Sequence, residues 1–308
     1  MRMPPRIFPP AKALFCRPTL PKADKKPREI VVKILADVHL HTTFCDGKNT
    51  VREMADAALR LGFTDLGFSE HAPSLFDPQF PGMADPAAYR AEVNAVKKAL
   101  AGQLAVSCGV EQDFYAPVQR EEYDYVIGSV HYVQPDKGVY RSVDSTLAEL
   151  QDTVNRYYGG DVLALMRNYY ENCVENARTL RPDIMGHFDV ALKHNESGCL
   201  LDENSTAYRG IALEAADAVA DYILPYGGIV EVNTGAIARG YRSTPYPADF
   251  LLRHLAQRGV RVMLTGDAHS ASSLCFAFDK ALAIVREAGF QQLALLRDGR
   301  FADVAITD

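Results

Sequence analysis

The chain has no run of apolar residues approaching the ~18 that a membrane span requires. It also has no C-x-x-C pair, and its six cysteines are widely scattered, at positions 16, 45, 108, 173, 199 and 275. This scatter indicates reduced thiols and a cytoplasmic location. Positive charge is in deficit, because 33 lysines and arginines stand against 39 acidic residues. The resulting formal net charge of −6 argues against a protein that binds nucleic acid by neutralising phosphates.

The positive charge that is present is concentrated at the N-terminus. Residues 1–33 carry nine basic and two acidic residues, which leaves 24 basic against 37 acidic residues in the rest of the chain. Repeated prolines in this segment interrupt the apolar core that a signal peptide needs. We therefore predict a basic, Pro-rich extension over residues 1–33 and a single catalytic domain over residues 34–308. The acidic composition of that domain is typical of proteins with carboxylate-lined cation sites.

From residue 30 onward, short β-type runs alternate with longer helical patterns. Strands are expected at 30–40, 63–71, 103–111, 123–131, 182–189, 227–234 and 260–269. Helices are expected at 49–62, 85–102, 145–160, 161–180, 205–224, 247–259 and 272–289, with Asn49 and Asp85 as N-caps and Gly62, Gly102, Gly259 and Gly289 after the last turns. This succession predicts a parallel sheet covered by helices, either open and doubly wound or closed into a barrel.

The position of the polar side chains favours the barrel. Nearly every predicted strand ends in a histidine or a carboxylate: His39, His41, His71, Glu111, His131, His187, Asp267 and His269. An open sheet collects its functional groups at one switch point between strands, whereas a (β/α) barrel collects them from many strands at its C-terminal rim. We therefore predict a distorted, TIM-like (β/α)7 barrel with the active site at that rim.

The residue types at this rim are those that bind metal ions. In the stretch ADVHLHTTFCDG (residues 36–47), His39 and His41 lie two residues apart on an expected strand and so point to the same face. Adding Asp46 to the residues above gives nine candidate ligands, more than the three or four that one zinc ion takes from a protein. The sequence thus predicts two or three divalent ions that share bridging carboxylates. His194 and His254 lie outside the pattern and are expected to be structural.

Six strings match, in order and spacing, the motifs of PHP-domain metallophosphoesterases: HLHTTFCDG, SEHAP, GVEQDF, IGSVHY, GHFD and TGDAH. The details resemble the histidinol-phosphatase family, including DYVIGSVHYV and the EVNTG string followed by YP. The resemblance covers residues 34–290 and implies three divalent ions of zinc, manganese or iron. It gives one ion His39, His41, Glu111 and Asp267, a second Asp46, His71 and His269, and a third Glu111, His131 and His187.

The resemblance also implies an activity in histidine biosynthesis. The expected reaction is hydrolysis of L-histidinol phosphate to L-histidinol and inorganic phosphate by attack of a metal-bridging hydroxide. Glu111 would bridge two ions, and Asp267 would also pass a proton to the leaving oxygen. Lys193, Arg239 and Arg242 are the candidates for binding phosphate. The chain departs from the family here, because Leu192-Lys193 replaces the arginine expected after GHFD and Arg239 is shifted by one residue.

Three alternatives stay open at this point. Another PHP phosphoesterase would act on a different small phosphorylated metabolite or nucleotide. A metal-dependent hydrolase of C–N bonds would share the barrel and the H-x-H pair, but the chain has no evident carbamylated-lysine motif at the fourth strand. A metal-buffering or polymerase-associated PHP module would have lost ligands, whereas this chain keeps all nine positions. We expect a small phosphate ester as the partner, with no nucleic acid and no membrane; the oligomeric state is open.

Overall fold

A computed structural model describes residues 36–306, and the predicted N-terminal extension lies outside these residues. Seven strands form one sheet in the order β1-β2-β3-β4-β7-β8-β9, and every neighbouring pair is parallel. They are β1 (Ala36–Asp37), β2 (Asp65–Phe68), β3 (Ala105–Asp113), β4 (Tyr125–Ser129), β7 (Ile184–Met185), β8 (Ile229–Asn233) and β9 (Arg261–Thr265). Each lies inside, or within two residues of, a predicted strand.

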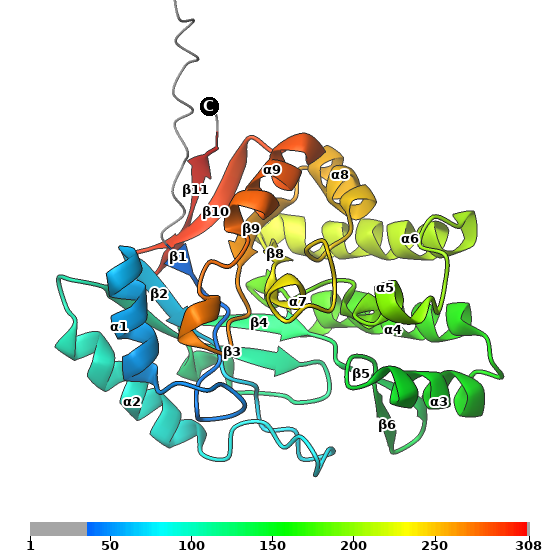
Figure 1. Cartoon of the computed structure of the whole chain (residues 1–308), viewed down its shortest axis with the longest axis horizontal. Helices are drawn as coiled ribbons and strands as arrows, with labels where there is room; N and C mark the ends of the chain where they lie inside the picture. Colours follow the sequence, from blue (N-terminus) through cyan, green and yellow to red (C-terminus); the bar gives the residue numbers. More distant parts are fainter. Residues whose placement is uncertain (1–35, 307–308) are drawn as a thin grey trace, which may run out of the picture. The chain divides into compact units, whose positions relative to one another are not determined.

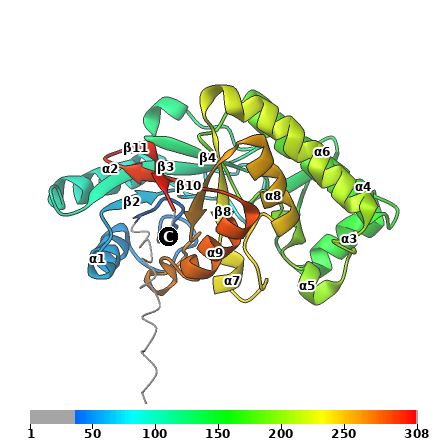
Figure 2. The ribbon, with the colours of Figure 1, turned by 90° about the horizontal axis from the view of Figure 1, so that it is seen from above.

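The sheet curls until its first and last strands meet. Beyond β1 and β9, the backbone N–H of His41 donates to the Ala268 carbonyl at 3.0 Å, and the N–H of Ala268 donates to the His39 carbonyl at 3.0 Å. The strands are surrounded by helices when the molecule is viewed from above (Figure 2). The predicted distorted (β/α)7 barrel is thereby confirmed, and both ends of the sheet carry histidines at the point of closure.

The seven expected helices are all present (Figure 1). They are α1 (Val51–Leu61), α2 (Pro86–Ala99), α3 (Leu147–Tyr157), α4 (Val162–Thr179), α6 (Thr206–Ile223), α8 (Asp249–Arg258) and α9 (Phe278–Ala288), and α5 (Asn195–Gly198) and α7 (Gly235–Ala238) are short additions. Helix α9 begins six residues later than predicted, because residues 271–273 form a 3-10 turn and Ala277 takes a positive φ of 59°. A left-handed residue ends any helix that would run through it.

Two of the predicted helix caps are wrong. Thr50, not Asn49, caps α1: its hydroxyl accepts from the N–H of Glu53 at 3.2 Å, and the Glu53 carboxylate accepts from the Thr50 N–H at 3.0 Å. This reciprocal capping box satisfies two N–H groups that the first helical turn leaves free. Helix α2 ends at Ala99, so Gly102 lies in the following turn rather than at the C-cap.

Two antiparallel hairpins extend the barrel beyond what the sequence predicts. The first, β5 (Tyr132–Asp136) with β6 (Val139–Ser142), follows β4. The second, β10 (Gln292–Arg297) with β11 (Arg300–Ala305), follows α9 and packs against β9, β1 and β2. Ala294 and Leu296 of β10 belong to the same core cluster as the barrel residues Val38, Tyr125, Ile127, Ile184, Ile229 and Met263. The C-terminal hairpin therefore covers the apolar interior of the barrel.

Tyr125 spans this interior and ties three strands together. Its hydroxyl donates to the main-chain carbonyls of Val38 and Phe68, at 2.5 and 2.9 Å. Gly67 and Gly109 leave space for the ring, since a Cβ at either position would come within 2.3 Å of Tyr125. The ring thus depends on two residues without side chains on the neighbouring strands.

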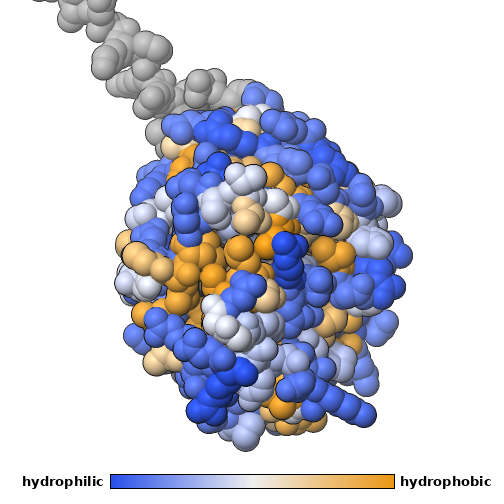
Figure 3. Space-filling view, turned by 90° about the vertical axis from the view of Figure 1, so that its right-hand side faces the viewer, coloured by the Kyte–Doolittle hydropathy of each residue, from blue (hydrophilic) through white to orange (hydrophobic). Residues whose placement is uncertain are grey.

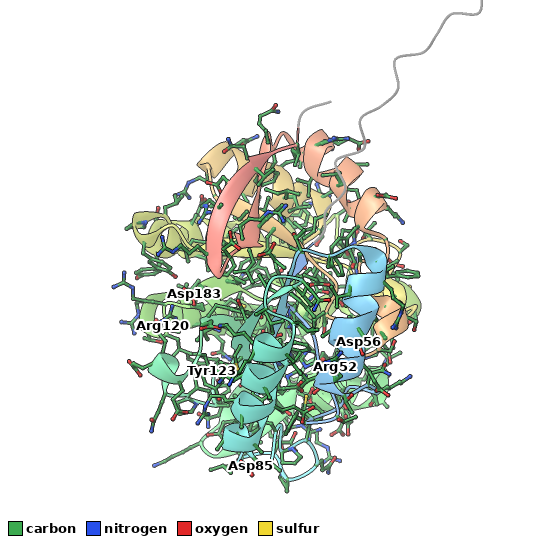
Figure 4. The ribbon with its side chains drawn as sticks, turned by 90° about the vertical axis from the view of Figure 1, so that its left-hand side faces the viewer. Arg52, Asp56, Asp85, Arg120, Tyr123 and Asp183 are labelled. Carbon is green, nitrogen blue, oxygen red and sulfur yellow. The ribbon has the colours of Figure 1, made fainter. Side chains whose placement is uncertain are left out.

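The surface carries ordinary ion pairs. On the exposed side of α1, Arg52 donates to Asp56 at 2.9 Å. Away from this helix, Arg120 donates to Asp183 at 2.6 Å (Figure 4). Apolar side chains gather between polar ones on the face formed by the outer ends of α3 to α6 (Figure 3). Within residues 36–306, no helix is both long and apolar enough to span a bilayer. Cys45, Cys108, Cys173 and Cys199 have free thiols, as predicted.

Candidate metal centre

The structure brings all nine predicted ligands to one end of the barrel. His39 and His41 follow β1, His71 follows β2, Glu111 lies in β3, and His131 and His187 follow β4 and β7. Asp267 and His269 follow β9, and Asp46 lies in the loop between β1 and α1. Because all seven strands are parallel, their C-terminal ends share one rim, and the side chains meet there.

Glu111 lies at the centre of this group. Its Oε2 is 3.3 Å from His39 Nε2, 3.5 Å from His41 Nε2 and 2.9 Å from His71 Nδ1. Its Oε1 is 3.3 Å from His131 Nε2 and 3.0 Å from His187 Nε2. Five imidazole rings therefore face the two oxygens of a single carboxylate, which is the arrangement that a bridging ligand requires.

The ligand atoms also fall into sets small enough to surround an ion. Atoms within 4.8 Å of one another form the sets His39–His41–Asp267, His41–Asp46–His71–His269, His39–Glu111–His187 and His71–Glu111–His131. The first two sets overlap the groups that the resemblance implies, with His41 added to the second. For the third implied group, the His131 and His187 Nε2 atoms are 3.2 Å apart and both face Glu111 Oε1.

Three buried ligand atoms at the centre of the group lack hydrogen bonds, as expected where an ion would bind. His39 Nε2, His41 Nε2 and Glu111 Oε2 lie close to other ligand atoms, but within the described residues none of these contacts has the geometry of a hydrogen bond. A buried polar atom without a partner costs about 1–3 kcal/mol. Imidazole nitrogens and carboxylate oxygens that converge in this way fit divalent zinc, iron or manganese.

The charges of the group match this interpretation. Burial opposes protonation of His39, but Glu231 and Glu111 raise its pKa well above the usual value. Burial, together with the rings of His71 and His269, lowers the pKa of His41 to about 3. In the absence of a cation, protons on some rings therefore balance the buried carboxylates, and the neutral His41 is in the form that binds a metal.

Asp267 is held as an anion. Burial alone would raise its pKa, but Arg239 and His39 lower the pKa of this carboxyl well below its usual range. Arg239 donates to Asp267 Oδ2 at 2.9 Å and to the Asp267 carbonyl at 3.0 Å. An ionised carboxylate suits the role of a metal ligand. The expected proton transfer by Asp267 stays a prediction.

A carboxylate that the sequence interpretation missed lies behind the ligands. Glu231 of β8 is fully buried and accepts from four donors: His39 Nδ1 at 2.8 Å, His187 N at 2.5 Å, Thr265 Oγ1 at 2.8 Å and Asn233 Nδ2 at 3.0 Å. By accepting a hydrogen bond from His39 Nδ1, it leaves Nε2 as the ring nitrogen whose lone pair can bind an ion beside Glu111. The available signal was a glutamate in the middle of the apolar run IVEVN.

Asp113 has a comparable role for His131. It accepts from the His131 backbone N–H at 2.8 Å and lies 3.4 Å from His131 Nδ1. Ser129 donates to Glu111 Oε1 at 2.7 Å and so orients the central carboxylate. These contacts fix the rings and the carboxylate before any ligand binds.

A cavity of about 610 Å³ opens onto the predicted ligands. This is within the range of sites for small molecules. Aromatic side chains form part of its wall: Phe76, Phe80, Tyr132, Tyr140, Tyr241 and Tyr246. The tyrosines of α3 and α4 do not line it, and Tyr169 and Tyr170 are buried in the core.

The three predicted phosphate-binding residues divide into two groups. Arg239 and Lys193 line the cavity, and Lys193 Nζ donates to the Asp144 carbonyl at 2.6 Å and to Asp144 Oδ2 at 3.3 Å. Arg242 is not among the lining residues. Its buried guanidinium donates to Glu203 at 2.9 and 3.0 Å and to the Leu192 carbonyl at 2.9 Å. Arg242 therefore does not line the cavity, and its position does not support the substrate-binding role expected for it.

The remaining histidines make structural contacts, as expected from the sequence, and Cys45 lies beside the ligands without joining them. His254 pairs with Asp217 at 2.8 Å, and His194 lies 3.2 Å from the Ser145 carbonyl. The Cys45 thiol donates to Glu70 at 2.6 Å. Burial and the charge of Glu70 raise the pKa of this thiol well above its usual value, so it stays protonated and weakly nucleophilic.

Comparison with known proteins gives consistent matches. A family model described as "PHP domain" matches residues 37–235. The probable histidinol-phosphatase of Deinococcus radiodurans is 33% identical over 83% of this chain and 94% of its own length. The histidinol-phosphatase of Bacillus subtilis is 26% identical over 80% of this chain and 97% of its own length.

Two solved structures share the fold. The putative histidinol phosphatase of Listeria monocytogenes aligns with a TM-score of 0.67 at 19% identity, covering 80% of this chain and 99% of its own. The histidinol phosphate phosphatase of Lactococcus lactis was solved in complex with zinc, L-histidinol and phosphate. It aligns with a TM-score of 0.65 at 20% identity, covering 87% of this chain and 98% of its own.

Proposed function

Because the chain belongs to the PHP-domain family and, within it, to the histidinol-phosphatases, we propose that it hydrolyses L-histidinol phosphate to L-histidinol and inorganic phosphate. The observation that carries the proposal is the convergence of six histidines and three carboxylates at one rim of the barrel, where all but the buried His39 and His41 line the cavity. A phosphatase needs such a site, since hydrolysis of phosphate monoesters is among the slowest uncatalysed reactions.

We propose that this centre holds three divalent ions of zinc, manganese or iron. Glu111 would bridge two of them, because its two oxygens face different sets of rings. Bound divalent ions supply positive charge that neutralises the phosphoryl oxygens and makes water acidic enough to attack at neutral pH. The zinc and L-histidinol in the Lactococcus lactis structure are consistent with this assignment.

The protein's own part is to orient the ligands and to bind the ester. Glu231 and Asp113 hold His39 and His131 in fixed orientations. Arg239, whose side chain is 32% exposed, lies beside Asp267 and His269 and would bind a phosphoryl oxygen. Lys193 would supply a second positive charge, as a single point rather than the two-pronged contact that an arginine makes. The aromatic wall would cover the imidazole of the substrate.

A second candidate is a PHP phosphoesterase acting on another small phosphate ester. The observation that favours it is the departure at Leu192-Lys193, where the family's arginine is absent from the wall of the cavity. Nucleotides and simple sugar phosphates carry the same phosphate but lack a free imidazole ring and an aliphatic ammonium group. A substrate comparison therefore separates the two candidates.

The test is a comparison of kcat/KM for L-histidinol phosphate, p-nitrophenyl phosphate and nucleoside monophosphates. We expect L-histidinol phosphate to be preferred by at least ~10-fold, since it alone carries groups for every part of the cavity. Preference for a nucleotide would overturn the substrate but not the phosphatase activity. Activity against no phosphate ester, with zinc, manganese or iron supplied in turn, would overturn both.

The bridging role of Glu111 has its own test. In Glu111→Gln, metal content and activity should fall together, because one charge faces five ligand rings. Metal content is measured by elemental analysis of protein purified without oxygen. The matched control is Glu175→Gln, which removes an exposed carboxylate paired with Arg178 on α4. Wild-type metal content and activity in Glu111→Gln would contradict the assignment.

A further inference from the structure

A carboxylate that takes no part in the proposed chemistry lines the same cavity as the metal centre. Asp144 lies between β6 and α3, lines the cavity, and has a side chain that is 24% exposed. Its Oδ1 accepts from Ser142 at 3.0 Å. Among residues 36–306, its Oδ2 has a single partner, Lys193 Nζ, at the long distance of 3.3 Å. Asp144 therefore has spare hydrogen-bonding capacity on the cavity side.

The surroundings of Asp144 place it close to the reacting end of the cavity. Burial works to raise its pKa, but Lys193, His131 and His187 lower the pKa well below the usual value. Val143, the residue before Asp144, donates its backbone N–H to the His131 carbonyl at 2.9 Å, and His131 and His187 line the same cavity as Asp144. Asp144 therefore lies beside the two proposed ligands of the third ion without belonging to any of the ligand sets. The Asp144 carboxylate is therefore ionised, although it lies next to the site where the anionic phosphate is proposed to bind.

The other carboxylates of the cavity that are not proposed ligands are already engaged or face solvent. Asp77 accepts from the Tyr132 hydroxyl at 2.6 Å and from the Gln79 N–H at 2.9 Å. Asp113 accepts from His131 and from the Tyr115 N–H. Glu149 is exposed, lies on α3 and is bonded to Ser145. Asp144 is the lining carboxylate best able to take a new cationic partner near the proposed ions.

The proposed substrate carries such a cation at a matching place. In L-histidinol phosphate, only two carbon atoms separate the ester oxygen from the ammonium nitrogen. When the phosphate lies on the metal centre, the ammonium group must therefore lie within a few ångströms of it. A group that recognises it must stand beside the ligands, as Asp144 does, and not at the far end of the cavity.

We propose that Asp144 binds the ammonium group of the substrate while Lys193, beside it, binds the phosphate. The inference rests on the proposed function. In the free protein the two side chains pair with each other, and in the complex each would exchange part of that pairing for the opposite charge on the substrate. The neighbouring pair would thus select phosphate esters that carry an amino group two carbons from the ester oxygen.

The experiment compares two substrates and two enzymes. The substrates are L-histidinol phosphate and its deamino analogue, 3-(imidazol-4-yl)propyl phosphate, and the enzymes are the wild type and Asp144→Asn. For the wild type, kcat/KM should be about 10- to 100-fold higher for L-histidinol phosphate, as expected for one hydrogen bond between charged groups. In Asp144→Asn this ratio should fall to within about threefold of one, with unchanged metal content. Lys193→Met should lower kcat/KM for both substrates and leave their ratio near the wild-type value.

Two further variants make the result specific. Asp56→Asn, on the exposed side of α1 (Figure 4), should keep the wild-type ratio. Asp77→Asn tests the competing carboxylate, and a loss of the ratio there but not in Asp144→Asn would overturn the proposal. If Asp144→Asn does not fold, Asp144→Glu, which keeps the charge but moves it, should lower the ratio by a smaller factor.

The two proposals fail in distinguishable ways. A wild type that hydrolyses both esters equally well overturns the role of Asp144 and leaves the phosphatase activity standing. Loss of metal from Asp144→Asn would make Asp144 part of the metal centre and would also overturn the role in recognition. A wild type that hydrolyses neither imidazole ester overturns the proposed function and this inference with it.

Discussion

The hydrogen bond from His39 to Glu231 allows a sharp prediction about metal affinity. The two Glu231 oxygens each accept from two donors: Oε1 from the His187 N–H and Asn233, and Oε2 from His39 and Thr265. A glutamine has one carbonyl oxygen and an NH2 group that accepts nothing. In Glu231→Gln, two of the four donors therefore lose their acceptor whichever way the amide turns.

The consequence reaches the ion through the His39 ring. The Glu231 carboxylate favours the tautomer of neutral His39 that carries its proton on Nδ1. Without this acceptor the proton can move to Nε2, and Nε2 then has no lone pair with which to bind the ion. A hydrogen bond to a charged group is worth about 1.5–3 kcal/mol, which corresponds to about 10- to 150-fold in a dissociation constant. We expect the tightest-bound divalent ion to bind Glu231→Gln about 10- to 100-fold more weakly, in line with other residues that orient metal ligands.

The assay is titration of metal-free protein with Zn²⁺ or Mn²⁺ against a competing chelator. Much of the lost activity should return when the metal is supplied in excess, because Glu231 is proposed to orient a ligand and to contact neither the substrate nor the ion. The exposed Glu175→Gln variant is the control for loss of a carboxylate. Metal affinity within about twofold of the wild type would refute the reasoning, since it would mean that the orientation of His39 does not depend on Glu231.

The remaining predictions concern phosphate binding and pH. Arg239→Ala should raise KM for L-histidinol phosphate by about 10-fold or more with metal content intact, because the guanidinium is proposed to bind the ester and not the ion. Loss of metal, or an unchanged KM, would contradict this prediction. The control is Arg253→Ala, which removes an exposed arginine. Metal should bind more weakly as the pH falls from about 8 to about 6, because neighbouring carboxylates raise the pKa of His39 and His131 and protons then compete with the ion. Titration of metal-free protein at several pH values checks this, and a constant dissociation constant would contradict it.

The barrel and its ligands could be predicted because they follow short-range rules. Alternating strand and helix patterns mark each βα unit, and in a parallel barrel the end of every strand is at the same rim. Residues as distant in sequence as His41 and Asp267 could thus be placed together, and their Nε2 and Oδ1 atoms lie 3.3 Å apart. The cap at Thr50 and the late start of α9 were missed, because they depend on backbone angles that residue type alone does not fix.

The two hairpins could not be predicted from the same rules. The β10–β11 hairpin is stabilised by contact with the barrel interior through residues such as Leu296. In strand β11 only Phe301 and Val304 are half-buried, and they do not alternate as the apolar residues of a strand usually do. The β5–β6 hairpin carries Tyr132 and Tyr140 into the wall of the cavity. In both cases tertiary packing decides the structure, and the local sequence has only a weak preference.

The residues behind the ligands were missed for a related reason. Glu231 and Asp144 lie outside the ligand positions of the six matched strings, and a single carboxylate within a strand or loop has many structural explanations. Their roles depend on partners far away in sequence, His39 for Glu231 and Lys193 for Asp144. A motif identifies the atoms that bind the ion, whereas the atoms that orient them become visible only in three dimensions.

The same packing explains why the fold and the proposed metals depend on each other. Buried carboxylates lie within or beside this end of the barrel, among them Glu70, Glu111, Asp113, Glu231 and Asp267, and burying a charge without a partner is strongly destabilising. Without metal, the carboxylates around the ligands are balanced by protonated rings and by Arg239. Divalent ions would replace those protons and satisfy the orphaned atoms of His39, His41 and Glu111. Bound ions should therefore raise the free energy of unfolding of this protein, because a ligand that binds only the native state stabilises it.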